Sequence, residues 1–332
     1  MTKKKWTAGQ MLETSGSYWK ACTLHAGVRL EIFTLIGNDH VGGDEIARRL
    51  GGDENGVNRL LNALTALGLL TKQQGRYANT PESKSLLVKD SPKYIGYIIM
   101  HHHHLVGAWS QLPQAVKSGR PVRERSSFSK DEERESFLMG MFNIAMNIAP
   151  GVADQIDLKG RSHLIDLGGG PGTYAIHFCK ANSDLRATVY DLPTTEPFAR
   201  RTIEQFSLTD RIDFVAGNYI EDDKIKGSYD VAWLSHILHG EGPEDCQKII
   251  RKIVSVLEAG GLIMVHDFIL NDNLDSPISP ALFSLNMLIN TPQGQSYSES
   301  QITSMLAKAG VKEIHRIPFR GPNDSGIISG VV

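Results

Sequence analysis

The stretch Ile165-Asp166-Leu167-Gly168-Gly169-Gly170-Pro171-Gly172 decides the fold of this chain. It follows an apolar run, residues 163–167, that is typical of a buried strand, and it precedes a helical pattern over residues 173–180. Glycines at such a junction let the backbone turn tightly and approach a ligand closely. A strand, a glycine loop and a helix in this order predict a site for a nucleotide-like cofactor.

The sequence around this loop alternates between strand and helix patterns. Strands are expected at residues 163–167, 187–190, 212–215, 231–234 and 261–266, and helices at 173–180, 196–206, 243–257, 280–290 and 298–309. This alternation predicts an α/β, Rossmann-like domain with a mostly parallel twisted sheet and helices on both faces. Right-handed crossovers in such a sheet place ligands at the carboxyl ends of the strands.

The first half of the chain has a mainly helical pattern. A helix opening at residue 44 and a second over residues 59–70 precede a hairpin at 71–79 with Gly75 at its turn, an order typical of a winged helix. Longer helices are expected at 91–117 and 130–148. The pattern changes within residues 151–162, so we expect a helical domain over residues 1–150 and the cofactor domain over 151–332.

Composition narrows the class of protein. The chain has 332 residues and a formal net charge of -2, which gives no general attraction to nucleic acid or to an anionic membrane. Its three cysteines form neither a disulfide framework nor a metal-binding pattern, which favours a reducing compartment. The lysines near the N-terminus precede no apolar stretch, and no apolar run reaches the roughly 20 residues of a membrane helix. We therefore expect a cytoplasmic protein.

Two cofactors fit the glycine loop. Gly170, Gly172 and Ala175 match the G-x-G-x-x-A pattern of dinucleotide sites, so NAD has to be considered. Asp166 argues against NAD because its carboxylate would repel a pyrophosphate, whereas it would suit the ammonium of a methionine moiety. Asp191 ends the second strand, 19 residues after Gly172, and could accept hydrogen bonds from ribose hydroxyls of either cofactor.

From residue 18 to residue 332 the chain resembles the S-adenosylmethionine-dependent O-methyltransferases that include plant caffeate and flavonoid, acetylserotonin and bacterial natural-product enzymes. The resemblance is carried by Arg59-Leu60-Leu61-Asn62-Ala63-Leu64 with Gly68-Leu69-Leu70, by Phe137-Leu138-Met139-Gly140-Met141 and by Leu285-Asn286-Met287-Leu288. It implies methyl transfer from S-adenosyl-L-methionine, with S-adenosyl-L-homocysteine as product. It also implies that the N-terminal winged-helix domain forms a homodimer and contributes to the substrate pocket.

The resemblance assigns cofactor contacts position by position. The loop that contains Gly168, Gly170 and Gly172 would run beside the methionine part. Asp191 would hold the ribose hydroxyls, and Leu192 would lie against the adenine. Gly217-Asn218-Tyr219 matches the family's Gly-Asp-Met/Phe, with Asn218 in place of the aspartate that holds the adenine amino group. An amide oxygen can still accept that bond, so weaker binding is expected. Ser235 stands where plant members often have a lysine.

Ser235-His236-Ile237-Leu238-His239 resembles the family's Trp-Ile-Leu-His-Asp segment, in which the histidine aligned with His239 is the catalytic base. The chemistry needs a base, because a phenol has a pKa near 10 and a histidine near 6.5. Asp267 aligns with the acid that orients this base. A second supporting glutamate of the family falls near Gln295 or Ser296, neither of which is acidic.

The resemblance also points to substrate-binding residues. Met100 and His101 align with pocket residues of the plant members, and His101 and His104 share one helical face. Further candidates are Phe137, Met141, Asn286, Met287 and Trp109. The run of four histidines, residues 101–104, could in principle bind a metal. A polar patch that contacts substrate hydroxyls is the preferred interpretation, and no metal is expected.

Two other functions remain open from the sequence. A winged helix could bind DNA. The candidate recognition helix and hairpin, however, offer only Arg59, Lys72 and Arg76 as cations, which are few for contacts with DNA phosphates. The same fold could instead methylate carbon or nitrogen, or bind the cofactor without methylating. Partners are therefore expected to be a small molecule and a second copy of the chain, with no nucleic acid and no membrane.

Overall fold

The computed structural model describes residues 5–123, 125 and 131–332, and the chain forms two compact units. Unit 1 comprises Met1–Leu105 and Glu135–Asn143, and unit 2 comprises Val106–Arg134 and Ile144–Val332. The division differs from a single cut near residue 150, because two helices, α7 (Gly96–Trp109) and α9 (Asp131–Gln155), each contribute residues to both units. Periodicity locates helices but does not show which core each turn joins.

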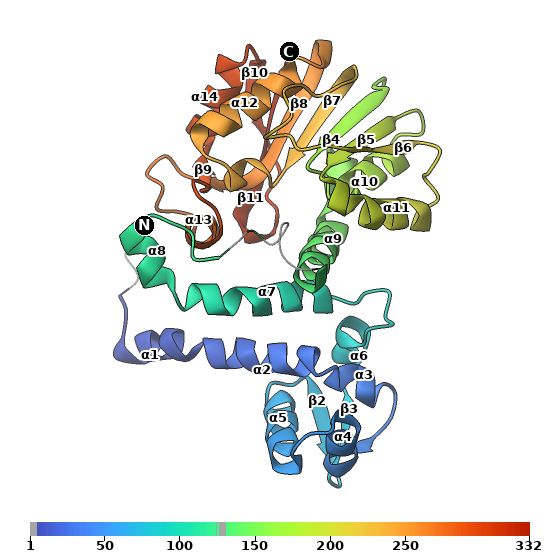
Figure 1. Cartoon of the computed structure of the whole chain (residues 1–332), viewed down its shortest axis with the longest axis vertical. Coiled ribbons are helices and arrows are strands. Elements are labelled where there is room, and N and C mark those ends of the chain that lie inside the picture. The colour runs from blue at the N-terminus through green and yellow to red at the C-terminus, as the bar shows by residue number, and fades with distance from the viewer. Residues whose placement is uncertain (1–4, 124, 126–130) are drawn as a thin grey trace. The chain divides into compact units, whose positions relative to one another are not determined.

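Unit 1 is mainly helical and carries one small sheet (Figure 1). Its elements are α1 (Ala8–Gly16), α2 (Tyr18–Arg29), α3 (Ile32–Ile36), β1 (Val41–Gly42), α4 (Gly43–Leu50), α5 (Glu54–Ala66), β2 (Leu70–Gln73), β3 (Arg76–Asn79) and α6 (Pro81–Leu87). Asp53 caps α5 by accepting a hydrogen bond from the Gly56 N–H at 2.7 Å. The β2–β3 hairpin turns at Gly75, whose φ of 76° favours glycine, and its position is the one the sequence predicts.

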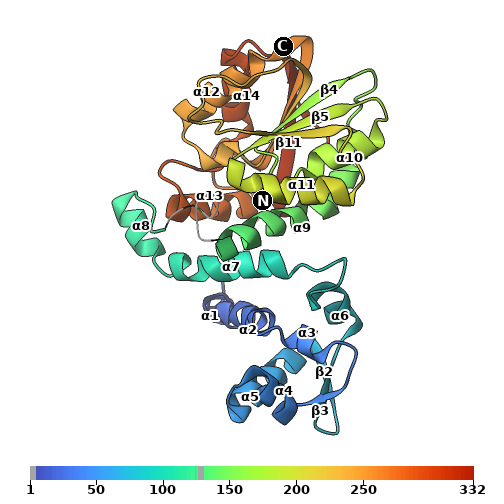
Figure 2. The same ribbon diagram turned by 45° about the vertical axis from the view of Figure 1, so that its right-hand side comes forward.

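Unit 2 alternates strands and helices (Figure 2). In chain order it contains α8 (Leu112–Ser118), β4 (His163–Leu167), α10 (Thr173–Ala181), β5 (Arg186–Asp191), η2 (Pro193–Thr195), α11 (Glu196–Gln205), β6 (Ile212–Ala216), β7 (Tyr229–Ser235), η3 (Leu238–Gly240), α12 (Pro243–Val254), β8 (Leu257–Leu270), α13 (Ile278–Asn290), β9 (Tyr297–Ser298), α14 (Glu299–Lys308), β10 (Lys312–Ile317), η4 (Pro322–Asp324) and β11 (Ser325–Val331).

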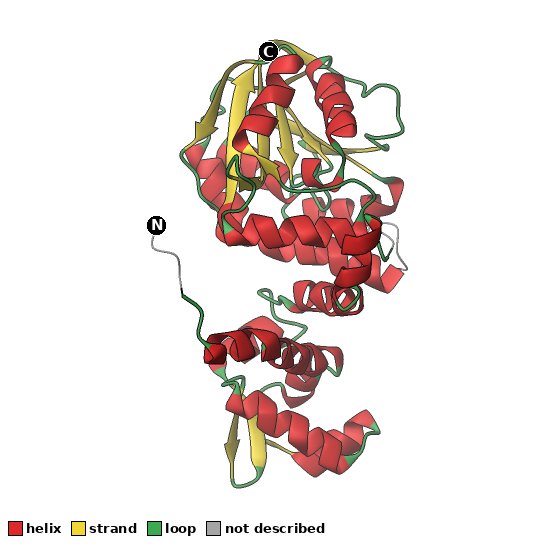
Figure 3. Ribbon diagram, turned by 90° about the vertical axis from the view of Figure 1, so that its left-hand side faces the viewer, coloured by secondary structure: helices red, strands yellow, loops and turns green. Residues whose placement is uncertain are grey.

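The main sheet has the strand order β10-β11-β8-β7-β4-β5-β6, and β9 pairs with β8. Strands β8, β7, β4, β5 and β6 run parallel, while β11 is antiparallel to both of its neighbours. Buried side chains of α9, α10 and α11 pack on one face of the sheet, and those of α12 and α14 on the other. Figure 3 shows the helices on both sides of the strands. The fold is the α/β, Rossmann-like arrangement that the alternation predicts.

The register brings polar strand ends together. Leu167 of β4 pairs with Tyr190 of β5, and Ser235 of β7 pairs with His266 of β8. Because these strands are parallel, the segments that follow them leave the sheet at the same edge. Asp166, Asp191, His236 and Asp267 therefore belong to one edge of unit 2.

One helix in the described part of the chain, α9, is long and apolar enough to cross a membrane by length and composition alone. Within unit 2 its residues Ile148, Ala149 and Val152 are buried against the sheet domain. A single such helix is weak evidence, because core helices of globular proteins pass the same test.

Candidate active site

The glycine loop joins β4 to α10 and needs its glycines for backbone reasons. Gly168, Gly170 and Gly172 have φ values of 64°, 55° and 78°, in the left-handed region that side chains other than glycine rarely adopt. A Cβ on Gly168 would also come within 2.6 Å of the Ile237 side chain. The backbone of this loop therefore favours glycine at all three positions.

Asp166 lies beneath this loop and is fully buried. Its Oδ2 accepts a hydrogen bond from the Ala175 N–H at 3.2 Å, whereas Oδ1 is buried without a hydrogen-bond partner among the described residues. Burial, together with the charge of Asp191, raises the pKa of Asp166 to about 7. A buried carboxylate oxygen without a partner is costly, so a cationic group placed here would be bound favourably.

Asp191 is held rigidly at the end of β5. Its Oδ2 accepts from the Gly170 N–H at 2.8 Å, and its Oδ1 accepts from the Leu192 N–H at 2.7 Å and from the Thr195 hydroxyl at 3.0 Å. Burial raises the pKa of this carboxyl as well. The bond to Gly170 fixes Asp191 to the glycine loop, so the two halves of the expected cofactor site are joined directly.

Asn218 follows β6 and uses its side chain locally. Its Oδ1 accepts a hydrogen bond from the Ile220 N–H at 3.0 Å, and its own N–H donates to Asp222 at 2.8 Å. Tyr219 lies close to the loop, since a Cβ on Gly168 would be 3.3 Å from the Tyr219 ring. The Glu221 N–H also donates to this oxygen, at 3.5 Å, so the amide oxygen of Asn218 is already used within the chain.

Ser235 belongs to a buried network that the sequence did not reveal. Its hydroxyl lies 3.1 Å from His266 Nδ1, and the Tyr174 hydroxyl lies 3.3 Å from the same nitrogen. His266 Nε2 lies 3.1 Å from the Ser325 hydroxyl. Burial holds the pKa of His266 well below its usual value, so this imidazole is neutral and structural. No one-dimensional pattern links residues 174, 235, 266 and 325.

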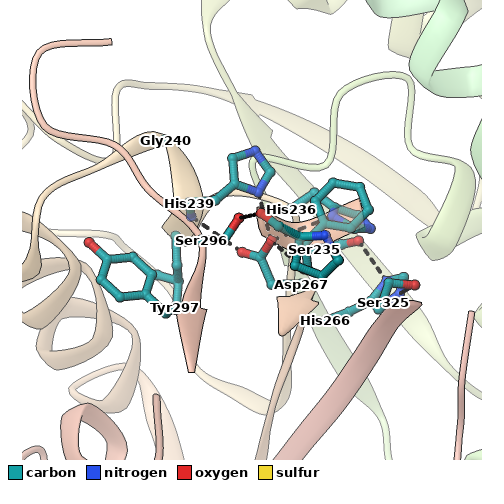
Figure 4. Close-up of polar contacts among 12 residues, drawn as sticks. Ser235, His236, His239, Gly240, His266, Asp267, Ser296, Tyr297 and Ser325 are labelled. Atoms are coloured by element: carbon teal, nitrogen blue, oxygen red, sulfur yellow. Dashed lines mark hydrogen bonds and ion pairs between the residues drawn. The ribbon is translucent and has the colours of Figure 1, made fainter. Parts of the chain in front are cut away.

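His239 and Asp267 are in contact (Figure 4). His239 Nδ1 lies 2.6 Å from Asp267 Oδ1, and the backbone N–H of His239 donates to Oδ2 at 3.3 Å. The Phe268 N–H also donates to Oδ1, at 2.8 Å. Burial alone would raise the pKa of Asp267, but the two imidazoles, of His239 and then His236, hold it well below its usual range. The carboxylate is therefore ionised and fixes the tautomer and orientation of His239.

His236 lies beside this pair. Its Nδ1 is 3.6 Å from Asp267 Oδ1, beyond hydrogen-bond distance, and that nitrogen is buried without a hydrogen-bond partner among the described residues. Its φ of 56° is unusual for a residue other than glycine. The turn at His236 redirects the chain after β7, so that His239 on η3 returns to the same carboxylate.

Aromatic rings surround His239. Phe283 of α13 meets it edge-on at 4.7 Å between ring centroids, and Phe268 stacks on it at 6.0 Å. Sequence reasoning missed Phe283, although its spacing of four residues from Met287 would have placed both on one face of α13. Ser296, which falls near the position of the family's second acid, uses its hydroxyl to donate to the Pro280 carbonyl at 2.8 Å.

An ion pair holds the segment that follows His239. Arg125 Nη1 lies 2.7 Å from Glu241 Oε1, and its Nη2 donates to the Gly240 carbonyl at 3.0 Å. A Cβ on Gly240 would come within 2.0 Å of that Arg125 nitrogen. Arg125 carried no signal in the sequence, because its partners are more than a hundred residues away.

The expected substrate residues fall in both units, and each set is described by itself. In unit 1, Met100 is buried in the core, His101 contacts Phe137 with ring centroids 5.3 Å apart, and His104 and Met141 are half-buried. In unit 2, Asn286 accepts a hydrogen bond from the Trp109 indole at 3.1 Å, and Met287 is buried.

Comparison with known proteins identifies the family. The O-methyltransferase domain matches residues 109–312, and the O-methyltransferase dimerisation domain matches residues 12–89. The chain is 32% identical over 319 residues to the 3-hydroxy-5-methyl-1-naphthoate 3-O-methyltransferase of Streptomyces sahachiroi, covering 94% of this chain and 92% of that protein. It is 29% identical to the tetracenomycin polyketide synthesis 8-O-methyl transferase of Streptomyces glaucescens, covering 96% of each.

A solved structure of PigF with S-adenosylhomocysteine has a TM-score of 0.89 at 25% identity and covers 98% of this chain and 100% of its own. The chain belongs to the O-methyltransferase family. It is an S-adenosylmethionine-dependent O-methyltransferase with a dimerisation domain, and S-adenosylmethionine is its cofactor.

Proposed function

We propose that the chain methylates a hydroxyl group of a small aromatic or polycyclic molecule, with His239 as general base and Asp267 as the group that orients it. The observation that carries this proposal is the 2.6 Å hydrogen bond between His239 Nδ1 and Asp267 Oδ1. It leaves the other ring nitrogen, Nε2, to face a substrate, and Figure 4 shows that nitrogen directed away from Asp267.

The bonds and protons balance without any further reactant. When bound, S-adenosylmethionine would supply the methyl group: its sulfonium C–S bond would break as the new C–O bond forms, and S-adenosylhomocysteine would leave. As the substrate oxygen forms its bond to that carbon, Nε2 of His239 takes the hydroxyl proton, and Asp267 stabilises the resulting imidazolium. Proton transfer of this kind contributes roughly 10²–10⁴-fold to rate. Holding the oxygen and the methyl carbon in line supplies a further large part.

The residues of the glycine loop edge fit the cofactor. Asp166 would pair its unpartnered Oδ1 with the ammonium of the methionine moiety. Asp191 would accept from the ribose hydroxyls, and Leu192 would lie against the adenine. Asn218 and Tyr219 would border the adenine side, and Ser235 would act on the site only through His266, to which it is bonded.

The aromatic substrate class is supported by the surroundings of the base and by the relatives. Phe268 and Phe283 make the side of His239 an apolar, ring-lined surface. One Streptomyces relative is a 3-O-methyltransferase of a hydroxynaphthoate, and the other is an 8-O-methyl transferase of tetracenomycin polyketide synthesis. We propose Asn286 and Met287 of unit 2, and Met100, His101, His104, Phe137 and Met141 of unit 1, as substrate contacts.

We further propose that the helical domain forms a homodimer through its N-terminal helices, in a winged-helix arrangement, and that the enzyme is cytoplasmic. Large apolar side chains on α1 and α2, Met11, Leu12, Tyr18 and Trp19, are exposed in the single chain. A patch of this kind is typical of a surface that a second subunit covers. The match of residues 12–89 to a dimerisation domain supports the same conclusion.

The test is methyl transfer by the wild type and by His239→Ala. Methyl-labelled S-adenosylmethionine is incubated with a panel of hydroxynaphthoates, phenols and polycyclic quinols, and the product is identified. We expect a labelled aryl methyl ether from the wild type and a kcat roughly 10²–10⁴-fold lower for His239→Ala. Calorimetry should show unchanged cofactor binding in the variant. Equal turnover of the two proteins would show that His239 is not the base.

A further inference from the structure

His236, His239 and Asp267 each offer one ligand atom, and these three atoms lie within 4.8 Å of one another. We propose that the three side chains together bind one divalent transition-metal ion of the zinc type, and that this ion switches the methyltransferase off. The binding does not depend on the proposed function, whereas the inhibition does, because it requires His239 to be the base.

The fold assembles these ligands without any rearrangement of the backbone. The N–H of His236 extends the β7–β8 ladder by donating to the His266 carbonyl at 2.8 Å, which places His236 next to Asp267. The left-handed backbone of His236 then turns the chain, and η3 brings His239 back to the carboxylate. The site is therefore held by the sheet edge itself and needs little ordering on binding.

The surroundings of the Nδ1 atom of His236 support the proposed metal site. His266 lies beside it, with ring centroids 4.5 Å apart, and both of its nitrogens have hydrogen-bond partners. His236 Nδ1 is also shielded from water but has no such partner among the described residues, and it lies 3.6 Å from Asp267 Oδ1. A buried polar atom left unpaired is costly. A metal ion shared with Asp267 would satisfy it.

The donor set selects the class of metal. Two imidazoles and one carboxylate suit zinc and its first-row neighbours, whereas magnesium and calcium prefer oxygen ligands. The carboxylate is already oriented, because the Phe268 N–H and the His239 N–H both donate to it. Hydrogen bonds of this kind, from groups that do not themselves bind the metal, hold a metal ligand in its binding orientation. Three protein ligands leave at least one coordination position for water or a substrate oxygen.

Metal binding and proton transfer exclude each other at His239. If the ion takes Nδ1, it replaces the 2.6 Å bond to Asp267, and the proton of the imidazole moves to Nε2, which can then no longer accept one. If the ion takes Nε2, the nitrogen that faces the substrate is occupied. Either arrangement stops the base from accepting the substrate proton.

The direct experiment is calorimetric titration of the full-length protein with Zn²⁺, with Mg²⁺ as the contrasting ion and Co²⁺ as a spectroscopic probe through its visible absorption. The exposed His102 and His103 are replaced by glutamine in the protein used, because a histidine run can bind zinc by itself. We expect one Zn²⁺ per chain, no comparable Mg²⁺ binding, and inhibition of methyl transfer that a chelator reverses.

The decisive variant is His236→Asn. Asparagine tolerates the left-handed backbone better than other side chains and removes the imidazole. We expect it to weaken Zn²⁺ binding by at least about tenfold, and Asp267→Asn to do the same. His177→Gln, which removes a histidine of α10 outside this cluster, serves as the matched control and should leave the affinity unchanged.

Cofactor binding and circular dichroism of each variant show whether it has folded. An affinity for Zn²⁺ that His236→Asn and Asp267→Asn both leave unchanged would overturn the proposal, as would the absence of stoichiometric binding. If zinc binds as expected but does not affect methyl transfer, the metal site stands and the role of His239 as base fails. The two proposals are thereby separable.

Discussion

Asp166 and Asp267 are both buried carboxyl groups of the main sheet, but their electrostatic surroundings differ. Both are buried, and each lies at the carboxyl-end edge of a parallel strand, β4 and β8. The pKa of Asp166 is raised to about 7 because burial is offset by only one N–H donor, whereas two imidazoles hold that of Asp267 below its usual range. Burial alone therefore does not decide the charge of a carboxyl group, and its partners do.

The contrast has a functional meaning. Asp267 already has a hydrogen-bonding imidazole partner, His239, within the chain, and in the function that we propose it orients this imidazole as the base. Asp166 has one oxygen without a hydrogen-bond partner among the described residues, so a cationic ligand could pair with it. In the function that we propose, these two carboxyl groups therefore serve different tasks, Asp166 in binding the cofactor and Asp267 in removing the proton.

The largest expected effect is on cofactor affinity. Asp166→Asn removes the charge that would pair with the ammonium of S-adenosylmethionine, and losing one partner of a buried charge pair costs about 2–5 kcal/mol. This corresponds to a Kd raised roughly 30-fold to several thousand-fold. Titration calorimetry measures it. A variant with wild-type affinity would show that Asp166 does not contact the cofactor.

Asp267→Asn should lower kcat and leave the affinity for the cofactor almost unchanged. It replaces a charge-assisted bond to His239 that is worth about 1.5–3 kcal/mol, so we expect kcat to fall roughly tenfold to a hundredfold with little change in cofactor Kd. Steady-state kinetics and calorimetry on the same preparation separate the two effects. If Asp166→Asn and Asp267→Asn gave the same pattern, the functional contrast between the carboxyl groups would be wrong.

The pH dependence of cofactor binding comes next in size. Only ionised Asp166 attracts the ammonium, so affinity should fall by up to about tenfold for each pH unit below the pKa of about 7 in the free protein. Above pH 8 the α-amino group of the cofactor, with a pKa of about 8, loses its charge, and affinity should fall again. Calorimetry across pH 5.5–9 measures both limbs. In Asp166→Asn the acid limb should disappear.

The carboxyl group of Asp166 also makes the folding stability of the cofactor-free protein depend on pH. The folded pKa is above the unfolded one, so the contribution of Asp166 to stability is present at low pH and is lost as pH rises from about 4 through about 7. Thermal melting of the wild type against Asp166→Asn isolates this contribution from those of other groups.

The smallest effect concerns the packing behind the base. A Cβ on Gly294 would come within 2.5 Å of the His239 carbonyl oxygen and 2.4 Å of the Thr291 hydroxyl. Gly294→Ala should therefore destabilise the fold by about 1–3 kcal/mol and displace His239, which would lower kcat more than cofactor affinity. Gly151→Ala, at a glycine with open space around it and no positive φ, serves as the matched control and should not lower the melting temperature. Unchanged melting of Gly294→Ala would contradict the packing.

Much of the fold followed from sequence. The glycine loop, the alternating strands and helices and the hairpin at Gly75 all appear where local pattern predicts them, because they depend on spacing and on backbone freedom. The His239–Asp267 contact was also expected, through resemblance. The division into units was not, because α7 and α9 each supply residues to both cores.

The sequence by itself determined the class of fold, the glycine loop and the types of residue at the strand ends, since these are encoded within a few neighbouring positions. Only the tertiary structure decided which acid is satisfied within the chain, that His236 turns with a positive φ toward Asp267, and that Ser235 joins Tyr174 and Ser325 around His266. These features depend on strand register and burial, and both arise from contacts between residues that lie far apart along the chain.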